Sequence, residues 1–91
     1  MKNYNMSHKV VVPPKVEKEI NSLPDKLFDN ITNHILRLSQ NPFPNSSIKL
    51  KNTLGYRIRV GDYRIVFDVD IKNKLVIIQR VAHRKDVYKG K

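Results

Sequence analysis

A tight reversal at Gly61-Asp62 constrains the fold of this chain more than any other feature. It lies between two stretches that alternate apolar and polar residues, and glycine in the first central position supplies the positive φ that a type II′ hairpin turn requires. A two-residue loop also fixes the register of the two strands. The expected cross-strand pairs, outward from the turn, are Val60–Tyr63, Arg59–Arg64, Ile58–Ile65, Arg57–Val66 and Tyr56–Phe67.

This register gives the hairpin one apolar and one cationic face, because directly opposed residues share a face of a sheet. The apolar face is expected to join the core and comprises Tyr56, Ile58, Val60, Tyr63, Ile65, Phe67 and Val69. The other face carries Arg57, Arg59 and Arg64. Like charges directly opposite each other destabilise a sheet, so folding gives no reason for this arrangement, whereas binding of an anion does.

Arg57 and Arg59 are two residues apart on a strand, so their side chains leave the sheet roughly 6.7 Å apart, which suits adjacent phosphates of a nucleic acid. Two other interpretations are open at this point. Asp68 lies on the same face and could pair with Arg57, and arginines on an exposed face are often only solvated. A single carboxylate cannot neutralise three guanidinium groups, which favours the anion-binding interpretation.

Positive charge is concentrated in the second half of the chain. The 91 residues suffice for a single domain over 1–91, with one sheet and one or two helices. The net charge is +10; residues 1–47 carry +2 (six basic, four acidic) and residues 48–91 carry +8 (twelve basic, four acidic). Such a field favours a polyanion, either nucleic acid or a strongly acidic protein, over a membrane surface.

Cysteine is absent, which excludes disulfides, thiolate catalysis and cysteine-based zinc sites, and fits a reducing cytoplasm. No apolar run is long enough to cross a bilayer, and Met1 to Lys9 lacks the apolar region of a secretory signal. We therefore expect a cytoplasmic protein that makes no membrane contact.

The segments before the hairpin predict one strand and two helices. A short β-branched strand over Lys9–Val12 is ended by Pro13-Pro14. Apolar residues then recur at helical spacing in two runs, separated by Ser22-Leu23-Pro24, which predicts a helical hairpin. The second helix runs from about Pro24 to Gln40, with an apolar face formed by Leu27, Phe28, Ile31, Ile35 and Leu38.

The predicted class is α+β. Asn45–Leu54 is expected to be an irregular basic connector, and Lys74–Ala82 a strand that is apolar on both faces and lies centrally. The N-terminal strand, the helical hairpin and a three-stranded antiparallel meander then form one four-stranded sheet packed on the helices. A loop of two or three residues around 71–74 would decide whether Arg80 or Gln79 shares the arginine face, and the sequence leaves this open.

The histidines and carboxylates do not form a metal or cofactor motif. His8, His34 and His83 are scattered, His34 is expected at a helix surface or boundary, and there is no Gly-rich phosphate loop. We therefore expect neither a metal nor a cofactor.

Arginine, histidine and tyrosine together can support metal-free RNA cleavage, in which a ribose 2′-hydroxyl attacks the neighbouring phosphodiester. Arginine would stabilise the charge that develops on the phosphorane. Histidine is the side chain with an unperturbed pKa near neutrality, which makes His83 a candidate proton acceptor, and Tyr88 could stack on a base. His83 could equally be a polar residue at a strand end.

The blocks YRIRVGDYRIVF (56–67) and VAHRKDVY (81–88) resemble the RelE/ParE superfamily of toxins from toxin–antitoxin modules, specifically its RelE branch. The order of elements also matches that family along nearly the whole chain. The resemblance implies a ribosome-dependent endoribonuclease that enters the A site and cuts messenger RNA. It further implies that Arg64 stabilises the transition state, that Arg84 lies near the leaving group, that Tyr88 stacks on a base, and that His83 is catalytic as in some members.

By the same resemblance, Arg57 and Arg59 match two basic residues of the family that are lysines in well-known members and act in substrate binding and proton abstraction. Arginine stays protonated, so the general base is open, with His83, Lys49 and Lys51 as candidates. We accordingly expect Arg59 to belong to the catalytic group, and Lys49, Lys51 and Arg57 to bind RNA.

The implied partners are a cognate acidic antitoxin of the RelB type, the ribosome with its messenger, and operator DNA only through the toxin–antitoxin complex. Two other functions are compatible with the sequence. One is a ParE-like toxin that poisons DNA gyrase by protein contact, and the other is a non-catalytic basic module that binds RNA or the ribosome.

Overall fold

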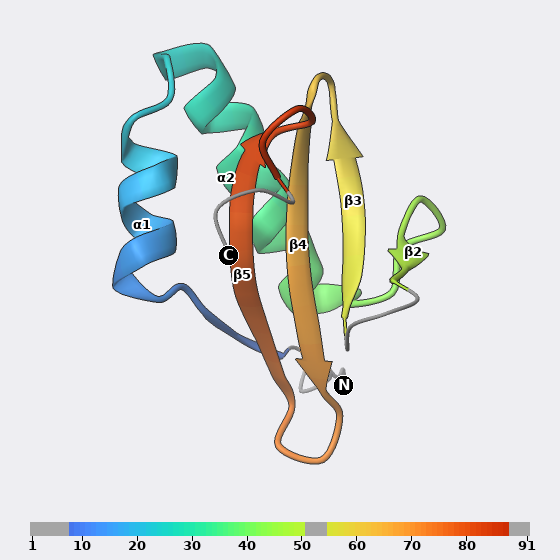
Figure 1. Ribbon diagram of the computed structural model, residues 1–91. Coiled ribbons are helices and arrows are strands. Elements are labelled where there is room, and N and C mark those ends of the chain that lie inside the picture. The colour runs from blue at the N-terminus through green and yellow to red at the C-terminus, as the bar shows by residue number, and fades with distance from the viewer. Residues whose placement is uncertain (1–7, 51–54, 88–91) are drawn as a thin grey trace.

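The computed structural model describes residues 8–50 and 55–87, and it has the α+β architecture that the sequence predicts (Figure 1). The elements in chain order are β1 (Lys9–Val11), α1 (Pro14–Asn21), α2 (Asp25–Gln40), β2 (Ile48–Lys49), β3 (Tyr56–Val60), β4 (Tyr63–Asp70) and β5 (Leu75–His83). None of the described helices is long and apolar enough to cross a membrane.

The sheet has five strands in the order β1-β5-β4-β3-β2, which corrects the expected four. The additional strand, β2, lies within the segment that was predicted as an irregular connector, and it pairs with β3 through Ile48 opposite Arg57 and Lys49 opposite Tyr56. A two-residue strand is too short to show an alternating pattern, so no local signal predicts it. The strand at the centre is β4, whereas β5 is interior only where the parallel strand β1 covers Leu75 to Ile77.

The hairpin of β3 and β4 confirms the predicted register at every pair from Val60–Tyr63 to Tyr56–Phe67. Gly61 has a φ of 60°, and Asp62 is not among the described non-glycine residues with positive φ. This combination fits a type II′ turn, because a type I′ turn would need positive φ at both central residues.

The loop between β4 and β5 is longer than expected. Asp70 pairs with Leu75, so the loop holds four residues, 71–74, and not two or three. The Asp70 carboxylate accepts hydrogen bonds from the backbone N–H of Asn73 at 3.0 Å and from its Nδ2 at 2.9 Å. These bonds, the side-chain one above all, hold the pKa of Asp70 below its ordinary value.

A β-bulge decides which face Arg80 takes. The β4–β5 register shifts between Val66 and Phe67, so Val66 pairs with Arg80 while Phe67 pairs with Ile78. The four-residue loop alone would have placed Gln79 opposite Val66, since each step along one strand is matched by one on its partner. The extra residue moves Arg80 onto the face that carries Arg57, Arg59 and Arg64.

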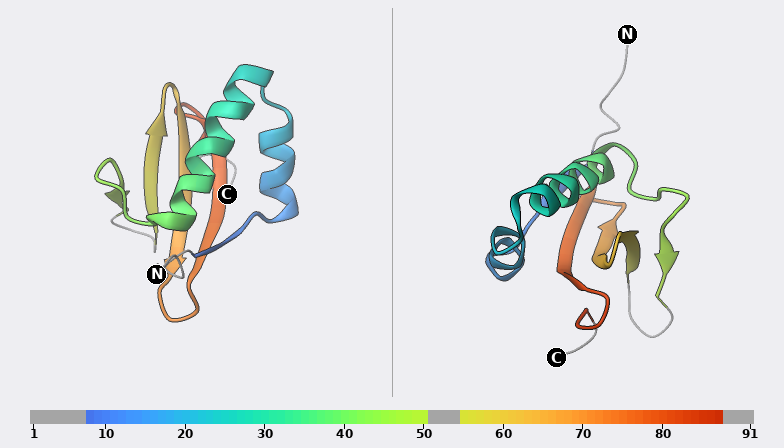
Figure 2. Two further views of the ribbon diagram at one scale, coloured as in Figure 1. Left: turned by 180° about the vertical axis from the view of Figure 1, so that it is seen from behind. Right: turned by 90° about the horizontal axis from the view of Figure 1, so that it is seen from above.

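One face of the sheet is covered by α2, with α1 beside it along β5, and the other face is open (Figure 2). The turn at Ser22 separates α1 from α2 as predicted, and proline stands at the start of α1, where a missing N–H costs nothing. The buried core lies between the helices and the sheet and consists of Val16, Ile20, Ile31, Ile35, Leu38, Ile58, Val60, Ile65, Phe67, Val76, Ile78 and Val81. The predicted apolar faces of the hairpin and of the second helix are thereby confirmed.

Candidate nucleic-acid interface

The three predicted arginines lie on the open face of the sheet, and we call Arg57, Arg59 and Arg64 the arginine face. Arg59 is paired directly with Arg64 across β3 and β4, and Arg57 is two pairs further along, opposite Val66. The apolar side chains of the same strands point to the helices, so alternation along the strands aims the guanidinium groups away from the core. Arg59 is exposed, and the other two are half-buried.

None of the three guanidinium groups forms an ion pair within residues 8–50 and 55–87. Asp68, which could have neutralised Arg57, instead accepts a hydrogen bond from the backbone N–H of Val69 at 2.8 Å. Arg64 donates from Nη1 to the carbonyl oxygens of Tyr63 at 3.1 Å and Gly61 at 3.5 Å, which holds it beside the hairpin turn. The positive charge of this face is therefore available to an anion.

A turn after β5 brings Arg84 next to the hairpin turn. The backbone N–H of Arg84 donates to the carbonyl of Asp62 at 2.7 Å, which continues the β4–β5 pairing by one step. The N–H groups of Asp86 and Val87 then donate to the carbonyl of His83 at 2.7 and 3.0 Å. Figure 1 shows the chain folding back over the open face at this point. Arg84 is exposed and lies at the end of the arginine face.

The structure does not bring His83 to the arginine face. His83 pairs with Tyr63, whose face of the sheet is the one that the helices cover, and the two rings meet edge to face with centroids 5.5 Å apart. The Nδ1 atom of His83 accepts a hydrogen bond from the backbone N–H of Lys85 at 3.1 Å. A neutral imidazole in this arrangement carries its proton on Nε2, so the ring can donate a hydrogen bond but has no free lone pair to accept a proton.

The predicted lysines do not add to the arginine face in the described part of the chain. Lys49 is exposed on the edge strand β2 and pairs with Tyr56, so the register places it on the helix side. Lys51 and Tyr88 lie outside the described residues. The structure thus brings together Arg57, Arg59 and Arg64 and sets Arg84 beside them.

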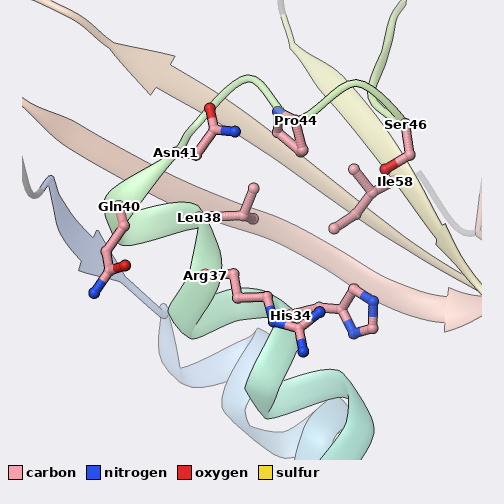
Figure 3. A pocket seen from close by; sticks show the side chains of 8 residues that line it. All are labelled: His34, Arg37, Leu38, Gln40, Asn41, Pro44, Ser46 and Ile58. Carbon is pink, nitrogen blue, oxygen red and sulfur yellow. The ribbon is translucent and has the colours of Figure 1, made fainter.

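A cavity of about 360 Å³ lies on the other side of the sheet, between the end of α2 and the following segment (Figure 3). His34 and Arg37 line it from α2, and Ile58 reaches it from β3. His34 lies within α2 and is half-buried, at the boundary between the exposed and the buried side of the helix, as predicted. Its Nδ1 donates to the carbonyl of Asn30 at 2.8 Å. The described residues contain no group of three or more histidines and carboxylates that could hold a metal ion.

Comparison with known proteins identifies the family. The family model for the ParE toxin of the type II toxin–antitoxin system, parDE, matches residues 10–88. The chain belongs to this family. It is a RelE-like member of the superfamily, as the sequence blocks around the hairpin and at the C-terminus predict.

The relatives of this RelE-like toxin support that placement. The chain is 27% identical over 89 residues to the putative toxin RelE1 of Methanocaldococcus jannaschii, covering 93% of this chain and 99% of the relative. The archaeal RelE–RelB complex from Pyrococcus horikoshii OT3 matches with a TM-score of 0.75 and 25% identity, covering 89% of this chain and 99% of the other. The RelB–RelE complex from Methanococcus jannaschii has a TM-score of 0.71 and 28% identity, with coverages of 89% and 98%.

A bacterial structure shows the same fold at lower identity. The RelBE2 complex from Mycobacterium tuberculosis has a TM-score of 0.77 at 22% identity, and the match covers 86% of this chain and 99% of the other.

The sequence predicted none of the contacts of Arg80, whose side chain lies on the open face but is bound by Glu19. Neither the bulge that turns Arg80 to this face nor the partner on α1 has a local sequence signal.

Proposed function

We propose that this toxin is a ribosome-dependent endoribonuclease that cleaves messenger RNA in the A site. The observation that carries the proposal is the alignment of Arg57, Arg59 and Arg64 on the open face, where none of them meets a carboxylate within the described residues. An aligned row of guanidinium groups binds phosphate oxygens through paired hydrogen bonds. It also costs folding free energy, because Arg59 faces Arg64.

In this mechanism the arginines hold the phosphodiester while the 2′-hydroxyl attacks it. Arg57 and Arg59 bind successive phosphates, and Arg64, fixed beside the turn by its carbonyl bonds, stabilises the charge on the phosphorane. Arg84 lies at the end of this row and is proposed to face the departing 5′-oxygen. The P–O5′ bond breaks as the 2′-O–P bond forms, and the 5′-oxygen takes its proton from water. Tyr88 is proposed to stack on a base of the messenger, as the family resemblance implies.

The acceptor of the 2′-proton is proposed to be His83, Lys49 or Lys51, since guanidinium groups stay protonated. His83 would first have to release the N–H of Lys85 from its Nδ1 atom. Lys49 would have to reach around the edge strand from the helix side. Single variants at the three positions, assayed under single-turnover conditions, identify the acceptor by the loss of the acidic limb of the pH–rate profile, because the rate falls at low pH when the general base is protonated.

We further propose that an acidic antitoxin of the RelB type covers the arginine face in the resting complex. The solved relatives from Pyrococcus horikoshii and Methanococcus jannaschii are complexes of RelE with RelB. A net charge of +10 supplies strong attraction for an acidic chain. Such a chain would inhibit the toxin by occlusion or by displacing the C-terminal segment with Tyr88, and operator DNA would be bound only through the complex.

The test is to map the 5′ ends of messenger RNA after incubating purified toxin with translating ribosomes. Wild-type protein should produce cuts within reading frames, and Arg64→Ala and Arg84→Ala should abolish most of them. Arg37→Ala is the matched control, because Arg37 is exposed on α2, on the helix side of the sheet. Intact messenger in the presence of folded wild-type toxin would overturn the proposal.

A second candidate function is poisoning of DNA gyrase by protein contact, because the family model that matches the chain is that of the ParE toxin. Such a toxin needs no catalytic group. Trapped gyrase–DNA complexes together with intact messenger would favour this function. Under it, Arg64→Ala would weaken the toxin only in proportion to the charge removed.

A further inference from the structure

Arg80 occupies a position between the helix layer and the C-terminal turn that the proposed mechanism does not use. It lies on the open face opposite Val66. Its Nε donates to Glu19 Oε2 at 3.0 Å, and its Nη1 donates to the carbonyl of Val87 at 3.3 Å. The side chains of Arg80 and Glu19 are 25% and 20% exposed, so water screens this ion pair only in part.

Glu19 is held in place independently of Arg80. Its Oε1 accepts a hydrogen bond from the backbone N–H of Val81 at 2.9 Å. This N–H lies on β5 beyond the three residues that pair with β1, where no strand in the described part of the chain is present to accept it. The Glu19 carboxylate therefore takes the place of a strand carbonyl. Val16 and Ile20 on the same helix are buried in the core, which fixes the position of α1.

The turn that follows β5 is tied down at both ends. At its start, the N–H of Arg84 binds the carbonyl of Asp62, and at its end the carbonyl of Val87 accepts from Arg80. The Val87 side chain is 4% exposed, yet it does not belong to the main core, and the same is true of Val66, the cross-strand partner of Arg80. The turn is therefore an ordered part of the open face.

We infer that Arg80, oriented by Glu19, is a positioning residue that fixes the turn of residues 84–87 and thereby holds Arg84 at the end of the arginine face. This rests on the proposed function of that face. A guanidinium suits the role, because its nitrogens can donate in two directions at once, to a carboxylate and to a carbonyl. A lysine ammonium at this position has one nitrogen and cannot reproduce both contacts from the same place.

The first experiment measures amide hydrogen exchange in Arg80→Met and Glu19→Gln. In the second variant the amide oxygen can still accept from Val81, but no carboxylate is left for Arg80. The N–H groups of Asp86 and Val87, which bind the carbonyl of His83, should exchange roughly tenfold faster in both variants, while core amides of β4 keep their protection. Arg37→Met and Glu17→Gln are the matched controls and should leave the turn unchanged.

The second experiment is a double-mutant cycle on the rate of RNA cleavage. If Arg80 acts through Arg84, Arg80→Met should lower kcat roughly tenfold in the wild-type background and less than about twofold in Arg84→Ala. Arg80→Lys should recover little of the lost kcat, because an ammonium group keeps the charge but cannot bridge the carboxylate of Glu19 and the carbonyl of Val87 as the guanidinium does. Equal losses in both backgrounds would overturn the inference, since Arg80 would then act only through its charge.

The two experiments separate this inference from the proposed function. Hydrogen exchange does not depend on RNA chemistry, so faster exchange in the turn supports the inference even if wild-type toxin cuts no messenger. In that case only the proposed function fails. Unchanged exchange at Asp86 and Val87 in Arg80→Met overturns the inference even if wild-type cleavage is strong. Glu19→Gln provides the same measurement should Arg80→Met fail to fold.

Discussion

Arg59 lies directly opposite Arg64 across β3 and β4, and neither forms an ion pair within the described residues. Two guanidinium groups held this close repel each other, and no fold needs them there. The pair is therefore a place where function and stability oppose one another, as is common where a protein binds an anion.

Arg59→Gln should raise the free energy of unfolding by roughly 0.2–1 kcal/mol at low ionic strength, because it removes this repulsion. The gain should shrink at about 1 M salt, where charges are screened within about 3 Å. Urea denaturation at both ionic strengths measures the effect. Lys72→Gln, in the exposed loop after β4, removes the same charge away from the pair and should change stability less. A destabilised Arg59→Gln would show that Arg59 has a structural partner.

Binding of single-stranded RNA should weaken steeply as salt rises. Each arginine that neutralises a phosphate contributes about 0.7 to the slope of log K against log salt concentration. Arg57→Ala and Arg59→Ala should each lower the slope by about that amount, and fluorescence anisotropy over a salt series measures it. The exposed helix residue Arg37 serves as the control, since Arg37→Ala should leave the slope unchanged. A slope that is insensitive to Arg57 and Arg59 would place the RNA elsewhere.

His83 should stabilise the turn that follows β5. His83→Ala loses the hydrogen bond that the backbone N–H of Lys85 donates to Nδ1, and it should cost about 1 kcal/mol of stability, together with much of the cleavage activity. His83→Asn should restore the stability, because an asparagine oxygen can accept the N–H two residues further on, and it should restore the activity as well if Lys49 or Lys51 is the proton acceptor. Thermal unfolding and single-turnover cleavage measure the two effects. Equal loss of activity in both variants, with stability kept in the asparagine variant, would indicate that the imidazole takes part in the chemistry.

Gly55 should tolerate no side chain. It is buried with a φ of +142°, and a Cβ atom there would lie 2.9 Å from the carbonyl oxygen of Phe67. Gly55→Ala should destabilise the protein by at least about 1–3 kcal/mol, the cost of such a backbone conformation, and the clash adds to it. Gly61→Ala has open space around its Cβ and should cost only about 1 kcal/mol for its left-handed φ. Chemical denaturation of the two variants should show this order, and the reverse order would mean that β3 and β4 can separate at Gly55.

The loop between β4 and β5 should lose order in acid. The hydrogen bonds from Asn73 lower the pKa of Asp70 from its ordinary 3.8 in the folded state. A lowered folded-state pKa means that the stabilisation is present above the ordinary value and is lost as the pH falls through the folded value. The chemical shift of the Asn73 amide should report this titration below pH 3.8. Asp70→Asn should remove the titration. A titration midpoint above the ordinary pKa of aspartate would show that Asn73 does not donate these hydrogen bonds to Asp70.

The sequence by itself determined the hairpin and the face on which its arginines lie. The turn at Gly61-Asp62 acts over a few residues, and strict alternation then carries the register from Val60 to Tyr56. The helical hairpin was predictable for the same reason, because the spacing of Ile31, Ile35 and Leu38 is itself local. Such features need no knowledge of distant contacts.

Tertiary structure alone decided the facing of Arg80, the placement of His83 on the helix side and the existence of β2. A bulge between Val66 and Phe67 reverses the face of every residue that follows it in the pairing, and nothing in the neighbouring residues announces it. The partner of Arg80 is Glu19, which is 61 residues away in the chain. The packing of α1 against the edge of β5 brings these two together, and packing between distant segments is what local patterns cannot encode.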